Sequence, residues 1–222
     1  MNNYFVILAA GKGKRFNKKI KKQFYYYKNK EIIDHSIEKS LNSKLFKRII
    51  IVSNNPSRLK KKKYPKIVRI IKGGKERSDS SLKALKYIKK FSPENVLIHD
   101  SARPDFSISL LKNLINKLKK NKAVIPYVFP TDSIKYKSQN QLFNLNRGKT
   151  LLTQTPQAFK FKDLYNLSLK KNKNITDESS LFIEKNYKIF FTKGENKNNK
   201  ITYLDDVKTH KTTFGIGFDI HR

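Results

Sequence analysis

The chain of 222 residues contains no cysteine and no tryptophan, and its acidic residues are few. The absence of cysteine excludes disulfide bonds, thiolate catalysis and cysteine-based metal sites. No apolar run is long enough to cross a membrane, and the amino-terminal residues lack the apolar core of a signal peptide. We therefore expect a soluble, cytoplasmic protein with no membrane partner.

The chain has 17 acidic residues but 50 lysines and arginines, which gives it a formal net charge of +33. Such an excess can indicate nucleic-acid binding. Here the lysines are spread along the whole chain among Asn and Ile, and no helix-turn-helix, zinc-finger or RNA-binding signature is present. We expect no specific nucleic-acid partner. A genome-wide bias toward these residue types is the hypothesis that would explain the composition.

Hydrophobic residues make up 37% of the chain, which is enough for one sizeable domain with a core. Apolar runs predict buried strands at residues 48–53, 67–71, 96–98, 124–129 and 187–192. Apolar residues at helical spacing predict helices within residues 31–41, 78–88, 107–120, 163–170 and 178–183, and a short last helix from Asp205. This alternation favours an α/β fold with parallel strands. Lys60–Lys63 is expected to be a solvated basic loop, and His35 a surface or packing residue.

The chain opens with an apolar run, Tyr4–Leu8, followed by the loop sequence Ala-Ala-Gly-Lys-Gly-Lys-Arg. Gly11 and Gly13 permit a tight turn, and successive N–H groups in such a turn bind anions. The cations of the loop have the sign that suits a polyphosphate. Neither the Walker pattern nor the dinucleotide fingerprint fits, because Phe16 stands where the third glycine of the latter would be. Taken alone, the loop supports a phosphate site and a plain strand-to-helix turn about equally.

A second glycine pair, Gly73-Gly74, follows the strand expected at 67–71 and leads into Lys-Glu-Arg-Ser-Asp-Ser-Ser. One interpretation is a glycine turn before a helix whose N-cap is Ser78 or Asp79. The other is a second ligand loop, in which backbone groups beside Gly74 read a base and Ser80 faces the nucleotide.

The segment His99-Asp100-Ser101-Ala102-Arg103-Pro104 stands at the carboxyl end of a predicted strand, where open α/β sheets bind ligands. An Asp100–Arg103 pair that closes a turn is a plain alternative. His99 and Asp100 are possible metal ligands, but the sequence offers no further cluster of ligands beside them. We favour a role in the site.

The α/β alternation breaks after residue 129. Residues 132–136 and 142–145 predict the two strands of a hairpin, joined through Ser138-Gln139-Asn140. A lone hairpin has little core of its own, so it needs a partner surface. Arg147 follows the hairpin, and Thr153–Phe159, with the sequence Thr-Gln-Thr-Pro-Gln-Ala-Phe, returns to the main body.

These motifs together resemble one family. Ala-Ala-Gly-x-Gly-x-Arg, followed by Lys22, is similar to the signature of enzymes that transfer a nucleoside monophosphate onto a phosphorylated sugar or alcohol. Gly-Gly-x-Glu-Arg-x-Asp-Ser, His-Asp-x-Ala-Arg-Pro and Thr-Pro-Gln then follow in the order found in the 2-C-methyl-D-erythritol 4-phosphate cytidylyltransferases. The resemblance extends from residue 5 to about residue 206.

The resemblance implies a Rossmann-like, mainly parallel sheet of the nucleotide-diphospho-sugar transferase type within residues 1–210. It also implies a β-hairpin arm at about 131–149 that embraces the second subunit of a homodimer. The implied reaction transfers CMP from CTP to 2-C-methyl-D-erythritol 4-phosphate, in the non-mevalonate isoprenoid pathway, with Mg²⁺ accompanying the nucleotide. Another sugar-phosphate nucleotidyltransferase is the alternative, and a basic nucleic-acid-binding protein a more distant one.

The resemblance also assigns roles to residues. Arg15 and Lys22 would stabilise the charge on a five-coordinate phosphorus. The residues expected to position methylerythritol phosphate are Arg147, Lys200, Asp100, Arg103 and Thr155. The residues expected to bind the nucleotide are Ala9, Ala10, Gly11, Gly13, Gly74, Lys75 and Ser80. Two positions depart from the family's pattern: Lys21 stands where Pro is usual, and Lys75 stands where many members carry an acid.

The last residues of the chain resemble a different family. Residues 213–222 read Thr-Phe-Gly-Ile-Gly-Phe-Asp-Ile-His-Arg and are similar to the opening of 2-C-methyl-D-erythritol 2,4-cyclodiphosphate synthase. In that family the Asp-x-His, here Asp219 and His221, supplies ligands to a divalent metal such as Zn²⁺. One Asp and one His cannot complete a three- or four-ligand zinc site. We expect residues 211–222 to begin a second, truncated domain of a bifunctional protein; a chance glycine-rich tail is the alternative.

Overall fold

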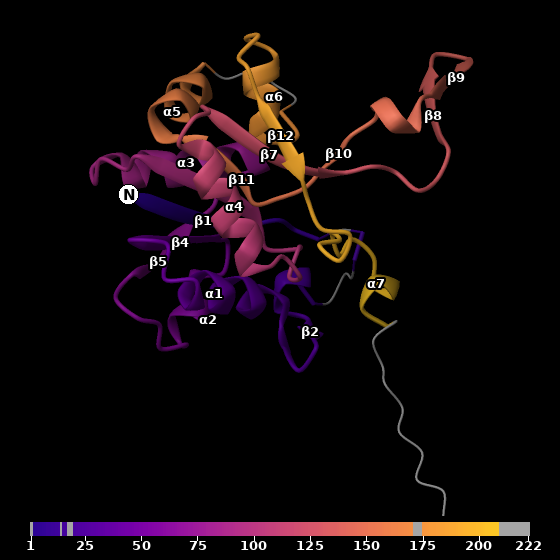
Figure 1. Cartoon of the computed structure of the whole chain (residues 1–222). Helices are drawn as coiled ribbons and strands as arrows, with labels where there is room; N and C mark the ends of the chain where they lie inside the picture. Colours follow the sequence, from indigo (N-terminus) through magenta and orange to yellow (C-terminus); the bar gives the residue numbers. More distant parts are fainter. Residues whose placement is uncertain (1, 14, 17–19, 171–174, 209–222) are drawn as a thin grey trace, which may run out of the picture.

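The computed structural model describes residues 2–13, 15–16, 20–170 and 175–208. Its centre is an eight-stranded sheet in the order β10-β7-β11-β6-β1-β4-β5, with β12 paired to β7 (Figure 1). The strands are β1 (Asn3–Ala9), β4 (Arg48–Ser53), β5 (Val68–Lys72), β6 (Asn95–Asp100), β7 (Ala123–Val128), β10 (Leu152–Thr153), β11 (Gln157–Lys160) and β12 (Phe190–Lys193).

Most pairings in this sheet are parallel. β1 lies between β4 and β6, β5 extends the sheet beyond β4, and β12 pairs with β7, all in parallel. β10 and β11 are the antiparallel members. The predicted α/β fold with a mainly parallel, Rossmann-like sheet is confirmed.

Helices cover both faces of the sheet (Figure 1). They are α1 (Ile32–Asn42), α2 (Pro56–Lys60), α3 (Arg77–Lys89), α4 (Ile108–Leu118), α5 (Phe161–Leu169), α6 (Glu178–Ile183) and α7 (Asp205–Lys208), with short 3₁₀ turns η1 (Lys22–Phe24) and η2 (Arg147–Lys149). Side chains of β1 alternate between the faces. Phe5 and Ile7 pack with α1 and α4, whereas Tyr4 and Val6 pack with α3 and α5. The sheet is therefore buried on both sides, as its apolar strands predict.

Three local predictions were only partly right. The segment around Lys60 is not a plain basic loop, because helix α2 occupies Pro56–Lys60 and Lys62 donates to the carboxylates of Glu31 and Asp34 at 2.7–2.9 Å. The last strand begins at Phe190 rather than residue 187. Tyr187 instead donates its backbone N–H to the Phe182 carbonyl and closes the end of α6.

The N-cap of α3 is Glu76, not Ser78 or Asp79. Asp79 lies at the third helical position, and its carboxylate accepts from the backbone N–H of Glu76 at 3.2 Å while the Glu76 side chain accepts from the backbone of Asp79. This reciprocal capping box satisfies two helix-start donors, which a single cap at Ser78 would not do.

The predicted hairpin is present as β8 (Ile134–Ser138) and β9 (Gln141–Leu145), which pair only with each other among the described strands. It projects away from the main body (Figure 1). Its apolar side chains are largely exposed, with Leu142 at 69% and Tyr136 at 55%. A second, shorter hairpin of β2 (Tyr26–Tyr27) and β3 (Lys30–Glu31) was not predicted. His35 packs under it, donating from Nε2 to the Tyr27 carbonyl at 2.7 Å.

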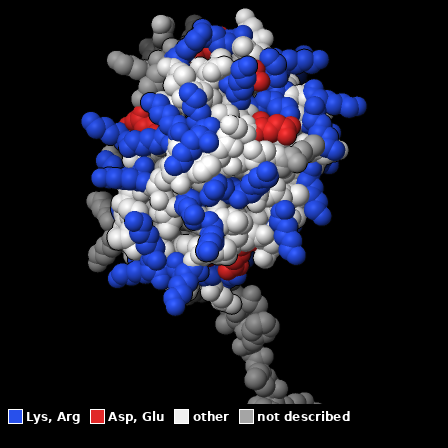
Figure 2. Space-filling model, turned by 90° about the vertical axis from the view of Figure 1, so that its left-hand side faces the viewer, with Lys and Arg blue, Asp and Glu red and all other residues white. Residues whose placement is uncertain are grey.

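The surface carries the charge that the composition requires. Figure 2 shows lysine and arginine side chains spread over one whole face, with acidic side chains as isolated spots. In the part of the chain that the structure describes, no helix is both long and apolar enough to traverse a bilayer.

Candidate active site

A cavity of about 290 Å³ opens at the carboxyl ends of β1 and β6. The chain runs from β1 to β4 and β5 on one side, and returns to β6 on the other side of β1. Such a switch in strand order leaves a crevice between the diverging loops. The lining residues are Leu8, Ala9, Ala10, Gly11, Lys12, Gly13, Arg15, Lys22, Gln23, Gly74, Lys75, Glu76, Arg77, Ser80, Asp100, Ser101, Ala102, Lys200 and Thr202.

The first wall of the cavity is the glycine loop after β1. Gly13 has φ +64°, a left-handed conformation that glycine adopts without strain. Gln23, buried beneath the loop, donates from Nε2 to the Ala9 carbonyl at 2.8 Å, and Asn54 donates to the Ala10 carbonyl at 3.0 Å. These bonds hold the backbone of the loop in place without a ligand.

The second wall is the loop before α3. The hydroxyl of Ser80 accepts from the Gly74 N–H at 3.0 Å and donates to the Glu76 carbonyl at 3.1 Å. Gly74 is closely packed, since an added Cβ would lie 2.2 Å from the Cβ of Asp79. Ser80 lines the cavity, and its hydroxyl also fixes the shape of its own loop; its contact with a nucleotide stays a prediction.

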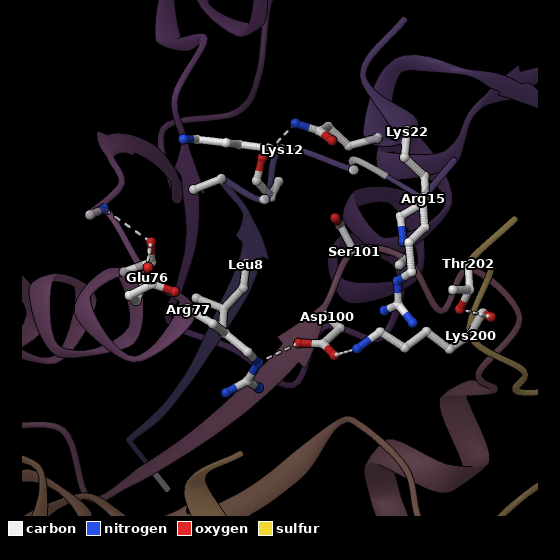
Figure 3. Close-up of a pocket in the computed structure, with 18 of the residues that line it drawn as sticks. Leu8, Lys12, Arg15, Lys22, Glu76, Arg77, Asp100, Ser101, Lys200 and Thr202 are labelled. Carbon is white, nitrogen blue, oxygen red and sulfur yellow. Dashed lines mark hydrogen bonds and ion pairs between the residues drawn. The ribbon is translucent and has the colours of Figure 1, made fainter. Parts of the chain in front are cut away.

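Three cations lie on one side of the cavity (Figure 3). Lys22 and Arg15 lie next to each other, and Lys200 lies nearby. The Nζ of Lys22 donates to the Ile201 carbonyl at 2.7 Å. Burial and the neighbouring Lys200 lower the pKa of Lys22 to about 8. The Arg15 guanidinium lies 6.0 Å from the centre of the Tyr203 ring.

Lys21, which stands where the resembled family usually has Pro, has a backbone conformation that proline could also adopt. Lys21 has φ −66° and ψ 129°, and a proline ring would fix φ at nearly the same value. Its Nζ donates to Oδ1 of Asn55. Lys22 therefore follows a residue whose conformation is compatible with the proline that is usual in the resembled family.

Asp100 lies at the floor of the cavity between two cations. Its Oδ1 accepts from Arg77 Nε at 3.0 Å, and its Oδ2 accepts from Lys200 Nζ at 2.8 Å (Figure 3). Burial alone would raise the pKa of this carboxyl, but Arg77 and Lys200 together hold it well below its usual range. Asp100 is therefore ionised at neutral pH.

Two predicted substrate residues do not line the cavity. Arg103 donates to the carbonyls of Asn198 and Thr153 at 2.8 and 3.3 Å, and the Asp100–Arg103 side-chain pair considered as an alternative does not form. The Thr155 hydroxyl accepts from the Asp100 N–H at 3.0 Å and lies 3.2 Å from His99 Nδ1. Thr155 thereby fixes the end of β6, and a contact of either residue with substrate stays a prediction.

Arg147 lies on η2, next to the β8–β9 hairpin, and does not line the cavity of its own chain. Its guanidinium donates to the Thr131 carbonyl at 2.8 Å. The structure thus brings together Arg15, Lys22, Lys200 and Asp100 but leaves Arg147 apart from them.

Several residues that line the cavity were not predicted from the sequence, including Gln23, Arg77 and Thr202. Arg77 belongs to the Glu-Arg pair of the second glycine motif, so its motif was visible although its role was not. Arg77 is also bound by Glu178, more than a hundred residues away in sequence, through two bonds of 2.9 Å. No local pattern marks Glu178 as a neighbour of the site.

The described residues contain no group of three or more acidic or histidine side chains that could hold a metal ion. Glu76 and Asp100 are the only carboxylates among the residues that line the cavity, and both oxygens of Asp100 already accept from cations. This donor set fits a Mg²⁺ that arrives on a triphosphate and keeps phosphate and water ligands, rather than a metal held by protein alone. Asp219 and His221 lie outside the described residues.

A Rossmann-like sheet with two glycine loops and a cluster of cations at its switch point is suited to binding a nucleotide through its phosphates. The sequence model of the family "2-C-methyl-D-erythritol 4-phosphate cytidylyltransferase" matches residues 4–214, and the chain belongs to this family. Its members are nucleotidyltransferases, so the predicted enzyme class is confirmed.

Individual relatives agree. The chain is 45% identical, over its full length, to the bifunctional enzyme IspD/IspF of Pelagibacter ubique, and it spans 60% of that protein. It is 34% identical to the 2-C-methyl-D-erythritol 4-phosphate cytidylyltransferase of Thermosipho africanus, with 91% of this chain and 93% of the relative covered.

Solved structures give the same result. The 4-diphosphocytidyl-2C-methyl-D-erythritol synthase of Anaerococcus prevotii superposes with a TM-score of 0.82 at 28% identity, covering 94% of this chain and 93% of the other. The bifunctional IspDF of Campylobacter jejuni superposes with a TM-score of 0.82 at 33% identity, covering 94% of this chain and 54% of the other. The chain thus spans little more than half the length of the bifunctional relatives that it matches.

Proposed function

We propose that this chain transfers CMP from CTP to 2-C-methyl-D-erythritol 4-phosphate, in the non-mevalonate isoprenoid pathway. The products are 4-diphosphocytidyl-2-C-methyl-D-erythritol and pyrophosphate. The observation that carries the proposal is the convergence of Arg15, Lys22 and Lys200 on one cavity that two glycine loops also line. Family membership supports the choice of both substrates.

The reaction needs two anions to approach each other. A phosphate oxygen of methylerythritol phosphate forms a bond to the α-phosphorus of CTP, and the bond from that phosphorus to the bridging oxygen of the β-phosphate breaks. The electron pair leaves with pyrophosphate, so no covalent protein intermediate is required. Positioning and charge stabilisation are what the protein must supply.

The cations divide this work. Arg15 and Lys22 would stabilise the charge that develops on the five-coordinate phosphorus, because a planar guanidinium pairs with two phosphate oxygens and an ammonium acts as a compact point charge. Lys12 and Lys75 line the same cavity and add positive charge for the triphosphate. The backbone of Ala9–Gly13 and the loop with Gly74 and Ser80 would hold the nucleotide.

Lys200 and Asp100 would receive the acceptor. Lys200 is paired with Asp100 at 2.8 Å, which holds its ammonium inside the cavity. Arg103 and Thr155, which flank Asp100 without lining the cavity, are proposed to complete the acceptor site. Mg²⁺ bound with CTP would neutralise phosphate charge and would keep phosphate and water as its main ligands.

The exposed hairpin supports a proposal about quaternary structure. We propose a homodimer in which the β8–β9 hairpin packs on the second subunit, since its apolar side chains lack a core of their own. Arg147 beside it would then reach the cavity of the partner chain. We also propose a cytoplasmic location. A second activity, carried by a domain that begins at residues 211–222, is a further proposal in line with the bifunctional relatives.

Product analysis tests the proposed reaction. CTP labelled at the α-phosphorus and unlabelled methylerythritol phosphate should give equal amounts of pyrophosphate and of a labelled diphosphate ester, with two coupled phosphorus signals in NMR. Release of labelled CMP or CDP without such an ester would contradict the proposal.

A further inference from the structure

The first residues of two helices that are far apart in sequence contact each other, and one of them also contacts Asp100. Arg77 is the first residue of α3, and Glu178 is the first residue of α6. Glu178 accepts from both terminal nitrogens of Arg77, Nη1 and Nη2, at 2.9 Å each. The Glu178 side chain is only 3% exposed and that of Arg77 is 23% exposed, so this is a bidentate ion pair that is buried on the carboxylate side.

The position of Arg77 is unfavourable by local rules. The amino-terminal end of a helix carries partial positive charge, which favours an acid there and disfavours a cation. Arg77 is therefore held by carboxylates rather than by its own helix. Burial alone would lower the pKa of Arg77, but Glu178 and Asp100 raise it above its ordinary value.

The bonds of Arg77 are distributed in a particular way. Glu178 takes both terminal nitrogens, which leaves the Nε–H edge as the donor that reaches Asp100 at 3.0 Å. Asp100 thus receives one bond from Arg77 through Oδ1, and its Oδ2 remains with Lys200 at 2.8 Å. Because Glu178 binds the two terminal nitrogens, it fixes the orientation of the whole guanidinium. If Glu178 lost its charge, the guanidinium would be free to turn and present both terminal nitrogens to the two oxygens of Asp100.

We propose that Glu178 is a positioning residue of this active site. By occupying the terminal nitrogens of Arg77, it keeps Asp100 bridged between Arg77 and Lys200, and so keeps Lys200 placed for the phosphate of the acceptor. The inference deepens the proposed function and rests on it, because Lys200 is the group that would bind methylerythritol phosphate.

The test compares Glu178→Gln with a matched control, Asp163→Asn. Asp163 also lies in the first turn of a helix and pairs with a lysine, Lys122, at 3.1 Å, but it is remote from the cavity. For Glu178→Gln we expect KM for methylerythritol phosphate to rise about 10- to 100-fold, as for a small misplacement of a binding group, with a smaller change in KM for CTP. Glu178→Asp, which keeps the charge on a shorter side chain, should fall between wild type and Glu178→Gln. Asp163→Asn should leave both constants unchanged.

A double-mutant cycle separates positioning from stability. If Glu178 acts through Asp100, adding Glu178→Gln to Asp100→Asn should change KM for methylerythritol phosphate by less than about twofold, because the bridge is already broken. Full additivity would overturn the inference, as would a correctly folded Glu178→Gln with wild-type constants.

A crystal structure of Glu178→Gln gives a readout that does not depend on the proposed reaction. The inference requires that Asp100 leave Lys200 and pair with both terminal nitrogens of Arg77; an unchanged bridge overturns it. If wild type makes no product from CTP and methylerythritol phosphate, the proposed function fails, and the crystal structure still decides whether Glu178 positions Asp100.

Discussion

The ammonium of Lys22 lies 2.7 Å from the carbonyl oxygen of Ile201, a residue 179 positions further along the chain. The contact joins the short 3₁₀ turn after the glycine loop to the segment that follows Lys200. Because this ammonium is partly buried and Lys200 lies nearby, the pKa of Lys22 falls to about 8. A group proposed to stabilise phosphate charge thus loses its proton near physiological pH.

The first prediction concerns pH. We expect the protonated form of Lys22 to be the active one, so kcat/KM for CTP should fall as pH rises through about 8. The pH at which kcat/KM falls gives the pKa of this group in the free enzyme. A bound triphosphate would stabilise the charged ammonium and raise the pKa of Lys22, so the corresponding fall in kcat should occur at higher pH. Rate–pH profiles from pH 6 to 10 provide the measurement.

Two controls accompany this profile. In Lys22→Arg the limb should move up in pH, whatever the absolute rate, because a guanidinium does not lose its proton in this range. The lowered pKa also means that the folded state binds fewer protons than the unfolded chain between about pH 8 and 10.5. The contribution of this group to stability therefore rises with pH in that window, so its deprotonation does not unfold the protein. An unchanged limb in Lys22→Arg would show that another group titrates.

The second prediction concerns charge stabilisation. Arg15→Ala or Lys22→Ala should lower kcat about a hundredfold or more, in line with the ~3–4 kcal/mol lost when one preorganised donor is removed. Thermal unfolding should change little in Arg15→Ala, because its side chain is exposed. Near-normal kcat in a folded Lys22→Ala would mean that another cation performs its role.

The third prediction contrasts two glycines of the cavity. An alanine at position 74 would place Cβ 2.2 Å from Cβ of Asp79 and 3.0 Å from its backbone carbon, so Gly74→Ala should cost about 1–3 kcal/mol of stability. An alanine at position 11 would meet no atom within 4 Å, so Gly11→Ala should fold normally and weaken CTP binding only. Denaturant unfolding and calorimetric titration with CTP distinguish the two. Equal stability losses would show that the loops are not packed as described.

The fourth prediction concerns the homodimer. If Arg147 completes the cavity of the partner chain, Arg147→Ala and Arg15→Ala homodimers should both retain only about one hundredth of the wild-type activity or less. Mixing them under conditions of subunit exchange should restore partial activity, because hybrid dimers contain one site with both arginines. Sedimentation that gives a monomer at working concentration, or no recovery despite proven exchange, would remove this part of the account.

Much of the fold was predictable because its signals are local. Apolar runs of strand length gave the positions of β1, β4 and β6, and helical spacing gave α1 and α4. The errors arose where a few polar contacts decide the outcome. Glu76 caps α3 through a reciprocal bond with Asp79, and Lys62 is tied to acids contributed by residues 31 and 34.

The site residues show the same difference between local signals, which could be predicted, and long-range contacts, which could not. Arg15, Lys22, Asp100 and Lys200 were predicted from motifs, and the structure brings them to one cavity. Glu178 was not predicted, because its importance depends on a contact across 101 positions with Arg77. No periodicity or short motif encodes a pairing at that separation. The role of Arg147 was predicted from the family resemblance, and its proposed place in a site depends on a second chain.

Base selectivity tests the central claim most directly. Purified protein is supplied with methylerythritol phosphate, Mg²⁺ and one of CTP, UTP, ATP or GTP, and pyrophosphate release is measured at matched concentrations. The account predicts that CTP supports release at least about a hundredfold better than the other three, as expected when a buried site is built to hydrogen-bond one base. Equal turnover with UTP would contradict the cytidylyltransferase assignment.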